Sequence, residues 1–541
     1  MDKSCRLNEL FEQSFINNHT LNLFSDYNGE IYTYEQIAEK INRLHQFYQY
    51  SGIEPGDKIA LIGRNSSNWG LVFLSVITYG SVIVPILPDF NTVDIQNIIN
   101  HSESKYLFAA DAFIDKIDKE SLTAIEGTVN LTTMTMVSGN AENWNKAINE
   151  SCSFDINTFR LKELKSDHLC ALSYTSGTIG HSKGVMIPAG SLYSNILYSK
   201  RVIPFKPKDT VLSFLPMAHI YGLLFDFLYP VTVGCHITFL TKPPSPQILI
   251  KALKEIKPRL ILSVPLIIEK IYRKQIVPKI QTPLMRILLK IPGISSLIYG
   301  KIRKSLLETF GGRFYEIVIG GASLSSEVER FFRKIDFPIT VGYGMTECGP
   351  LISYEYFKRT RPLSAGRMVD RMEVRIDSSD PYRVVGEILV KGDNLMLGYF
   401  KNDEATRETI DEDGWLHTGD LGVTDKDQFI YIKGRCKNMM LGPNGQNIYP
   451  EEIEVKLSNM PLIAECVVVE RDGKLVGLVF PDHEAAKEME VAGSQFDEMM
   501  EENRQLVNKD LPRYSQISRI ELVQEEFEKT PKRNIKRYRY T

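Results

Sequence analysis

The stretch from Tyr174 to Gly184, Y-T-S-G-T-I-G-H-S-K-G, constrains this chain more than any other. It follows a short apolar run, 169–173, and combines glycines, hydroxyls and one lysine. Glycines allow backbone angles at which successive N–H groups point into one concavity, an arrangement that favours a bound anion. The predicted phosphate ligands are Thr175, Ser176, Gly177, Thr178, Gly180 and Lys183. The lysine spacing differs from G-x-x-x-x-G-K-[ST], so a kinase-type P-loop is disfavoured, and an ordinary Gly/Ser surface turn is the alternative.

Composition limits the class of protein. At 541 residues, 43% of them hydrophobic, the chain exceeds one ordinary core, so two or more domains are expected. The formal charge of −3 gives no sign of a nucleic-acid partner. The seven cysteines are scattered without C-x-x-C spacing, and the first twenty residues lack a continuous hydrophobic run. Neither a disulfide framework nor a signal peptide is expected, and a reducing cytoplasm fits best.

The first section predicts a parallel α/β arrangement. Thr33 and Gln36 form a capping-box pattern ahead of an amphipathic helix, and strands are expected at 58–62 and 106–109. The uncharged stretch 70–88 is interrupted by Gly80 and Pro85, so it predicts a buried helix at 71–79 followed by a strand at 82–85, not a membrane span. The segment 111–166 shows no periodicity that assigns its elements.

Further strands end in distinctive residues. Strands are expected at 212–215, 260–264 and 316–319, and a long apolar helix is expected after Gly222. Because open α/β sheets bind ligands beyond strand ends, the loops P-M-A-H-I-Y-G at 216–222 and G-Y-G-M-T-E-C-G at 342–349 are candidate site segments. The texture becomes β-rich from residue 386, and a small α+β unit follows, with a helix at 450–457 and a hairpin turning at Asp472-Gly473.

These segments together resemble one family. The chain resembles the adenylate-forming (AMP-binding) superfamily, and most closely bacterial long-chain fatty-acid–CoA ligases, the acyl-CoA synthetases, from about residue 30 to the C-terminus. The resemblance implies an α/β fold with two domains. Residues 1–434 would form a large N-terminal domain of α/β sheets with a β-barrel-like region, and residues 435–541 a small mobile α+β domain with its hinge at Lys437.

The resemblance also implies a reaction. A fatty acid would attack the α-phosphate of ATP to give an acyl-adenylate and pyrophosphate, and coenzyme A would then displace AMP, with Mg²⁺ and fixed donors stabilising the charge on the phosphates. An acyl-AMP ligase that loads a carrier protein is one alternative. A catalytically impaired nucleotide and acyl binder is another.

Roles for individual residues follow from the same resemblance. The β- and γ-phosphates would be held by Thr175, Ser176, Gly177, Thr178 and Lys183, the α-phosphate would be contacted by Thr346, and Mg²⁺ would be bound by Glu347. Adenine would be approached by Gly320, Gly321 and Ala322 and stacked on by Tyr343, which is beside Gly344, and the ribose would be bound by Asp420 and Arg435. The acyl site would be lined by His219 and Gly222. Outside the motif, Tyr343 would be interpreted as a core aromatic and Glu347 as a solvated acid. Cys348 has no histidine near it in sequence, which argues against a nucleophile.

The chain departs from the family pattern in two places. Ile179 and Ser182 stand where threonine and proline are common, which predicts an altered grip on pyrophosphate. The family ends in Thr-Pro-x-x-Lys, whose lysine acts in adenylation, but Asn534 occupies that position here. Lys536 would substitute for it if the loop slips by two residues, since that shift preserves the side-chain face of an extended segment.

A basic, apolar stretch stands outside these motifs. Between Glu269 and Glu308 there are nine Lys or Arg and two Glu, a local charge of +7, interleaved with isoleucines and leucines. This pattern suits a helix pair on a membrane surface near a fatty-acid entrance, and a packed, charged surface hairpin is the alternative. The expected location is therefore the cytoplasm, with peripheral contact at the inner face of the membrane.

Overall fold

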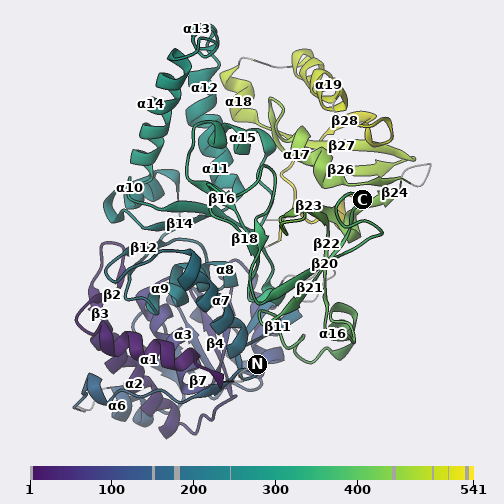
Figure 1. The fold of residues 1–541 in the computed structure, drawn as a ribbon. Coiled ribbons are helices and arrows are strands. Elements are labelled where there is room, and N and C mark those ends of the chain that lie inside the picture. Colours follow the sequence, from purple (N-terminus) through teal and green to yellow (C-terminus); the bar gives the residue numbers. More distant parts are fainter. Residues whose placement is uncertain are drawn as a thin grey trace.

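The structure is a computed structural model that describes residues 4–148, 153–175, 183–243, 245–441, 446–489, 491, 493–509, 511–530 and 535–541. A large N-terminal domain of mixed α/β sheets carries a smaller C-terminal domain, drawn in yellow-green and yellow in Figure 1. The expected fold class is confirmed.

The first sheet carries the predicted phosphate loop. Its seven strands run in the order β11-β10-β5-β4-β6-β7-β8, with a parallel centre and an antiparallel pair at each edge. They are β11 (Lys183–Pro188), β10 (Leu169–Thr175), β5 (Val82–Ile86), β4 (Lys58–Ile62), β6 (Tyr106–Ala109), β7 (Gly127–Asn130) and β8 (Thr135–Ser138). The strands expected at 58–62 and 106–109 are confirmed. The unassigned segment 111–166 supplies β7, β8, α5 (Asp111–Ile114), α6 (Ala141–Ile148) and β9 (Leu164–Lys165), which pairs with β1 (Ser4–Cys5).

Two further sheets lie beside it. The second contains β12 (Thr210–Ser213), β13 (His236–Phe239), β2 (Asn22–Asp26) and β3 (Ile31–Thr33), in which only β3 is antiparallel to its neighbour. The third contains β14 (Leu260–Ser263), β15 (Glu316–Ile319) and β16 (Ile339–Val341), which are all parallel. The Arg259 N–H donates to the Thr210 carbonyl (2.8 Å), which places β14 next to β12. The strand at 212–215 was expected two residues too late, because the parallel pairing of β12 with β13 ends at Ser213.

Helix α3 (Ser67–Tyr79) is buried on nearly every face. It begins earlier than the expected residue 71, because the Ser66 side chain accepts a hydrogen bond from the Trp69 N–H and caps it. A Cβ built on Gly70 would lie 2.9 Å from the Phe227 ring and 3.3 Å from the rings of Phe239 and Phe24, so only glycine fits there. The uncharged stretch is a buried core helix and strand. No helix in the described ranges is long and apolar enough to cross a membrane.

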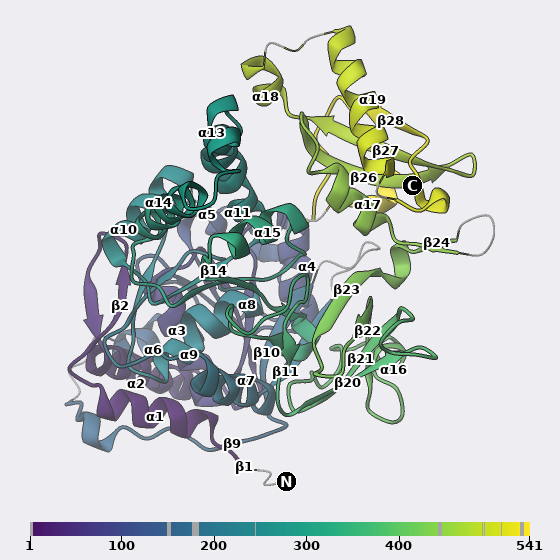
Figure 2. The ribbon, with the colours of Figure 1, turned by 45° about the horizontal axis from the view of Figure 1, so that its top comes forward.

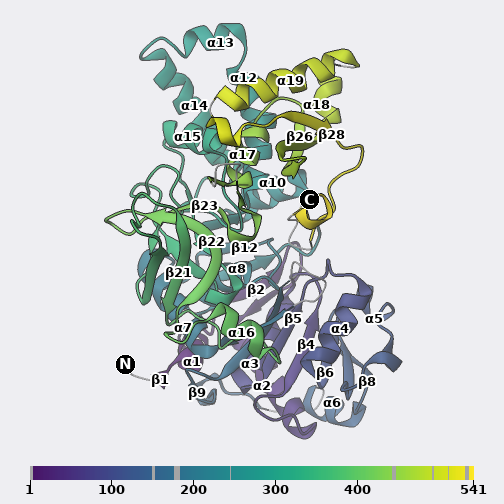
Figure 3. The same cartoon turned by 90° about the vertical axis from the view of Figure 1, so that its right-hand side faces the viewer.

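The other helices cover the sheets (Figures 1 and 3). The capping box of α2 is confirmed, since Thr33 and the Gln36 side chain exchange hydrogen bonds with each other's backbone N–H. The apolar helix expected after Gly222 is interrupted: α8 (Ile220–Gly222) continues as a π-helical segment, Leu223–Leu228, and ends as α9 (Tyr229–Val231). The remaining N-domain helices are α1 (Leu7–Asn17), α2 (Tyr34–Tyr50), α4 (Thr92–Ser102), α7 (Ala189–Val202), α10 (Pro246–Ile256), α11 (Pro265–Ile271), α12 (Val277–Ile280), α13 (Pro283–Leu288), α14 (Ile294–Thr309), α15 (Ser326–Lys334) and α16 (Asp403–Thr409).

The β-rich region is two antiparallel sheets. One contains β17 (Tyr343–Gly344), β18 (Leu351–Tyr354) and β19 (Arg367–Met368), and the other β20 (Met372–Asp377), β21 (Gly386–Gly392), β22 (Leu416–Thr424) and β23 (Ile430–Arg435). Strand β23 leads directly into the C-terminal domain, which Figure 2 shows above it.

The C-terminal domain has its own core. It contains β24 (Met440–Leu441), β25 (Asn447–Ile448), α17 (Pro450–Leu457), β26 (Ile463–Arg471), β27 (Lys474–Pro481), α18 (His483–Glu488), α19 (Ser494–Lys509) and β28 (Arg519–Leu522). The expected helix at 450–457 and the hairpin turn at Asp472-Gly473 are confirmed. Polar contacts join it to the N-terminal domain: Arg273 donates to the Ile463 carbonyl (3.4 Å), Ser325 Oγ to Asn459 Oδ1 (2.8 Å), and Lys274 pairs with Glu484 (3.0 Å).

A buried acid begins the central strand of the third sheet. Glu316 is fully buried and accepts hydrogen bonds from the Tyr354 hydroxyl and the Phe357 N–H (2.6 Å). Burial raises its pKa from 4.5 to about 8, although both hydrogen bonds oppose the shift. The folded protein therefore keeps this proton up to about pH 8, whereas the unfolded chain releases it near pH 4.5.

We expect Glu316→Gln to be more stable than the wild type, by a margin that grows as the pH rises from about 4.5 to about 8 and then levels off. The neutral amide keeps the acceptor and has no proton to lose. Urea denaturation at a series of pH values measures the margin, with the exposed Glu308→Gln as a control for the exchange itself. A margin that shrinks with rising pH would contradict the assignment.

Candidate functional site

The two ends of the predicted phosphate loop lie side by side. Thr175 ends β10 and Lys183 begins β11, and the two residues are paired across the antiparallel ladder. Ser176, Gly177, Thr178 and Gly180, together with Ile179 and Ser182, lie outside the described residues. The strand pair therefore places Thr175 and Lys183 next to each other at the two ends of the loop.

Tyr399 connects this loop to the next motif. The chain at 397–400 runs along β11, with hydrogen bonds between Leu397 and Met186 (2.9 Å), Met186 and Gly398 (3.0 Å), and Phe400 and Gly184 (2.8 Å). The Lys183 ammonium lies 4.8 Å from the centre of the Tyr399 ring, and the Tyr399 hydroxyl donates to Glu347 Oε1 (2.9 Å). The predicted phosphate lysine and the predicted magnesium ligand thus contact one tyrosine. Sequence reasoning missed Tyr399, because its partners are distant in the chain.

Asp420 is held between two other predicted residues. The Tyr343 hydroxyl donates to Asp420 Oδ2 (2.7 Å), and Arg435 Nε pairs with Asp420 Oδ1 (3.0 Å) across the β22–β23 ladder. Burial raises the pKa of the Asp420 carboxyl, and the Arg435 charge and the Tyr343 hydrogen bond oppose the rise. Arg435 itself is two-thirds exposed, with a side-chain exposure of 66%. A buried carboxylate with an exposed cation beside it can accept hydrogen bonds from a polar ligand at the surface.

The end of β15 lies next to Tyr343. Ile319 of β15 pairs with Val341 of β16, and the Gly342 N–H donates to the Ile319 carbonyl (2.9 Å). The predicted turn Gly320, Gly321 and Ala322 follows β15 at this same edge, with Gly321 at φ +86°. A Cβ on Gly320 would lie 3.0 Å from the Tyr221 ring, so this position accepts little more than glycine.

The predicted acyl-site segment is attached to the same edge. His219 is partly buried and precedes α8, and a Cβ on Gly222 would lie 3.2 Å from the Pro216 carbonyl oxygen. The Tyr221 hydroxyl donates to the Val318 carbonyl of β15 (3.0 Å). In the π-helical segment that follows, Asp226 is buried, and neither carboxyl oxygen has a hydrogen-bond partner among the described residues. Burial raises the pKa of Asp226 well above its usual range.

The loop between Tyr343 and Leu351 contains Thr346, Glu347 and Cys348. Thr346 and Cys348 are buried, and burial raises the pKa of the Cys348 thiol well above its usual range, which agrees with the prediction that it is not a nucleophile. A buried amide network holds this loop to α7. Asn195 Oδ1 accepts from the Leu351 N–H (3.2 Å), and Asn394 Nδ2 donates to the Leu351 carbonyl (2.8 Å). Sequence reasoning missed both asparagines, since neither lies in a recognisable motif.

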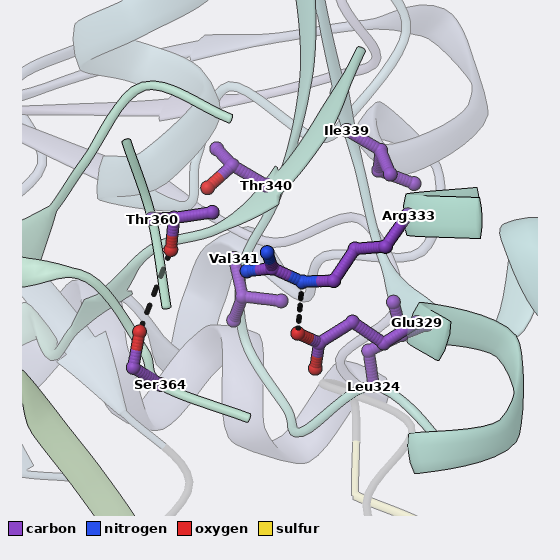
Figure 4. Close-up of a pocket in the computed structure, with 8 residues that line it drawn as sticks. All are labelled: Leu324, Glu329, Arg333, Ile339, Thr340, Val341, Thr360 and Ser364. Carbon is purple, nitrogen blue, oxygen red and sulfur yellow. Dashed lines mark hydrogen bonds and ion pairs between the residues drawn. The ribbon is translucent and has the colours of Figure 1, made fainter. Parts of the chain in front are cut away.

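A small cavity borders this region without joining it. Figure 4 shows it between α15 and β16, lined in part by Leu324, Thr340 and Ser364. Beside it, within α15, Arg333 Nε pairs with Glu329 Oε1 (2.9 Å), which also accepts from the Leu363 N–H (2.9 Å) and so joins α15 to the chain after β18. The lining of the cavity includes none of the predicted site residues.

Two predicted residues, Lys437 and Lys536, lie beyond the end of β23. Lys437 is exposed in a single 3₁₀ turn, Cys436–Asn438, directly after β23. Lys536 pairs with Glu528 (3.7 Å), and its N–H donates to the Glu528 carbonyl (2.8 Å). Arg537 binds Glu454 with two hydrogen bonds (2.5 and 2.6 Å) and so anchors the tail to α17. Asn534 lies outside the described residues.

Known proteins share this arrangement. The family model of the AMP-binding enzymes matches residues 15–400, and that of the AMP-binding enzyme C-terminal domain matches residues 438–541. The chain belongs to the AMP-binding enzyme family. It is 26% identical over 516 residues to the long-chain-fatty-acid–CoA ligase ACSBG2 of Rattus norvegicus, covering 87% of this chain and 76% of the relative. It is 27% identical over 526 residues to the 4-coumarate–CoA ligase CCL1 of Humulus lupulus, covering 94% and 88%.

Solved structures share the fold. The anthranilate–CoA ligase AuaEII in complex with anthranoyl-AMP superposes with a TM-score of 0.80 at 18% identity, covering 100% of this chain and 97% of that one. This similarity confirms the architecture of an adenylate-forming enzyme, with a large N-terminal and a separate C-terminal domain.

We expect Tyr399→Phe to weaken binding of MgATP about tenfold, because the Glu347 carboxylate loses the hydroxyl that orients it while the ring beside Lys183 remains. Isothermal titration calorimetry measures the affinity. Tyr32→Phe is the matched control, since that hydroxyl also donates to a glutamate, Glu30 (2.8 Å), but in another sheet. Unchanged MgATP affinity in Tyr399→Phe would remove Tyr399 from the site.

Proposed function

We propose that this protein is an ATP-dependent long-chain fatty-acid–CoA ligase that acts through an acyl-adenylate. The observation that carries the proposal is that motifs far apart in the sequence contact one another in the fold. Lys183 and Glu347 meet at Tyr399, and Tyr343 of the same loop as Glu347 binds Asp420 beside Arg435. Cationic, hydroxyl and carboxylate groups are thereby brought close together, and these are the groups that binding a nucleotide and its phosphates requires.

The chemistry has two steps. A carboxylate oxygen of the acid attacks the α-phosphorus of ATP, forming an O–P bond as the bond to pyrophosphate breaks. The thiol of coenzyme A then attacks the acyl carbon, so that a C–S bond replaces the C–O bond to AMP and the thiol proton is released. The first step leaves charge on the phosphates, and fixed donors that neutralise that charge accelerate it.

The residues have distinct roles in this proposal. Asp420, held by Tyr343 and Arg435, accepts hydrogen bonds from the ribose hydroxyls. Lys183 neutralises the leaving pyrophosphate. Glu347 offers a carboxylate oxygen to Mg²⁺, which prefers few carboxylates together with substrate phosphates, and the ion would add positive charge at the phosphates. The turn after β15 lies at the strand end beside Tyr343, and a Cβ built on Gly321 would meet nothing within 4 Å, so a base can approach the backbone there.

The family and its members support the acid–thiol ligase class, but the relatives are named for different acid substrates. The rat relative is named for long-chain fatty acids and the hop relative for 4-coumarate, at 26% and 27% identity. The acyl chain is therefore the part of the proposal that needs a direct measurement.

Domain movement is part of the proposal. We infer that the domains divide at 434/435 and that the C-terminal domain turns about Lys437 between the two half-reactions. Two observations support this movement. Lys437 is exposed in a single turn, and the contacts that Arg273 and Ser325 make with the C-terminal domain are polar, so the two domains can separate readily.

The test is ATP–pyrophosphate exchange with magnesium and without coenzyme A, comparing palmitate, octanoate, 4-coumarate, benzoate and acetate. We expect exchange to be fastest with palmitate. Mass spectrometry after addition of coenzyme A should then show palmitoyl-CoA. If exchange were fastest with 4-coumarate or benzoate, the proposed substrate would be an aromatic acid and not a long-chain fatty acid. Exchange without a coenzyme A product would favour carrier-protein loading, and ATP binding without any exchange would favour an impaired homologue.

We expect Lys536→Ala to slow adenylation at least about tenfold and to leave thioester formation from synthetic palmitoyl-AMP unchanged, because the loss of a positioned cation affects only the step that develops charge on the phosphates. Pyrophosphate exchange and the isolated second half-reaction measure the two steps. Arg539→Ala is the matched control, since Arg539 pairs with the same Glu528 (2.6 Å).

Equal adenylation by Lys536→Ala and the wild type would remove Lys536 from the reaction. In that case Asn534→Lys, which restores the family lysine, tests whether the tail retains the family register.

A further inference from the structure

The chain between β14 and β15 forms a projecting helical arm, here residues 277–305. It contains α12, α13 and most of α14, and none of its residues is buried. Figures 1 and 3 show α13 at the end of the molecule farthest from the first sheet. Because the arm buries no side chain, it contributes little to the core. Packing in the core therefore does not explain its aliphatic and basic residues.

Large aliphatic side chains gather at the tip of the arm. Leu284 is 67% exposed, Ile287 62% and Leu297 70%, and Ile291 and Ile294 between them are 41% and 38% exposed. Leu284 and Ile287 are three residues apart in α13 and share one of its faces. Single exposed apolar residues are common, but five within residues 284–297 mark a surface that meets another apolar phase.

The same arm is positively charged. Residues 270–307 contain nine Lys or Arg and neither Asp nor Glu, in a chain whose net charge is −3. Arg273, Lys274 and Arg303 at the base of the arm bind the C-terminal domain or Asp336. Toward the tip, Lys279, Arg286 and Lys290 form no ion pair with any described residue.

This combination selects one kind of partner. A second copy of the chain would bring like charges together, which opposes self-association through this face. Protein hot spots favour tryptophan and tyrosine, whereas the exposed groups at this tip are leucine and isoleucine. Leucine and isoleucine among lysine and arginine suit a bilayer interface, where anionic headgroups meet the cations and acyl chains accept the aliphatic groups.

We propose that α13 and the first turns of α14 dock onto an anionic lipid bilayer. The contact is interfacial: α13 has only six residues, and no described helix can cross a membrane. This surface is distinct from the nucleotide site, and its binding requires neither ATP nor an acid, so the proposal stands independently of the proposed reaction.

The test is vesicle co-sedimentation of the full chain, without nucleotide, using phosphatidylcholine alone and phosphatidylcholine mixed with phosphatidylglycerol. We expect binding only to the mixed vesicles. The double variant Leu284→Asp/Leu297→Asp should weaken it at least about tenfold. The variant Arg286→Glu/Lys290→Glu should weaken it about 25-fold or more, since each cation near an anionic leaflet strengthens binding about fivefold. All four side chains are exposed, so the variants should fold normally.

Matched controls lie elsewhere on the surface. Ile31→Asp/Val93→Asp changes two aliphatic residues that are 53% and 64% exposed, and Lys162→Glu/Lys242→Glu reverses two exposed cations. Neither should change vesicle binding. Equal binding to both vesicle types, no binding, or equal losses in the controls would overturn the proposal. Concentration-dependent dimerisation that only the arm variants abolish, without vesicle binding, would instead assign the arm to a second copy of the chain.

Discussion

The pairing of β11 with the chain at 397–400 is the contact on which the site depends. Three backbone hydrogen bonds hold these segments in register, and that register sets the Tyr399 ring against Lys183 and its hydroxyl against Glu347. A shift by one residue would turn Tyr399 to the opposite face and separate the phosphate loop from the acidic loop. The backbone ladder thus positions charged side chains that have little contact with each other directly.

Buried polar groups complete this framework. Asn195 binds the backbone N–H of Leu351 and Asn394 binds its carbonyl, and Asp420 joins β22 and β23 to the loop at Tyr343. Such groups are stable inside a protein only when their partners are present, so they specify a single arrangement of the segments they join. The basic, apolar arm differs in kind, because its side chains are left exposed and are available to an external surface.

Local patterns predicted much of the fold. The capping box at Thr33, the strands at 58–62 and 316–319, and the hairpin at Asp472-Gly473 follow from neighbouring residues, and the structure contains them. Predictions were less accurate where distant contacts decide the ends of elements. Strand β12 stops where its pairing with β13 stops, and the apolar segment after Gly222 contains a π-helical turn that its composition does not reveal.

For this protein the sequence by itself determined the family, the two-domain α/β architecture and the identity of the loops that follow the strands, because motif spacing and hydrophobic periodicity are local properties of the chain. Only the tertiary structure decided which loops meet. Tyr399 lies more than two hundred residues from Lys183, and Asn394 lies 199 residues from Asn195, yet both pairs are neighbours. Contacts across such separations arise from sheet register and packing, which no local pattern encodes.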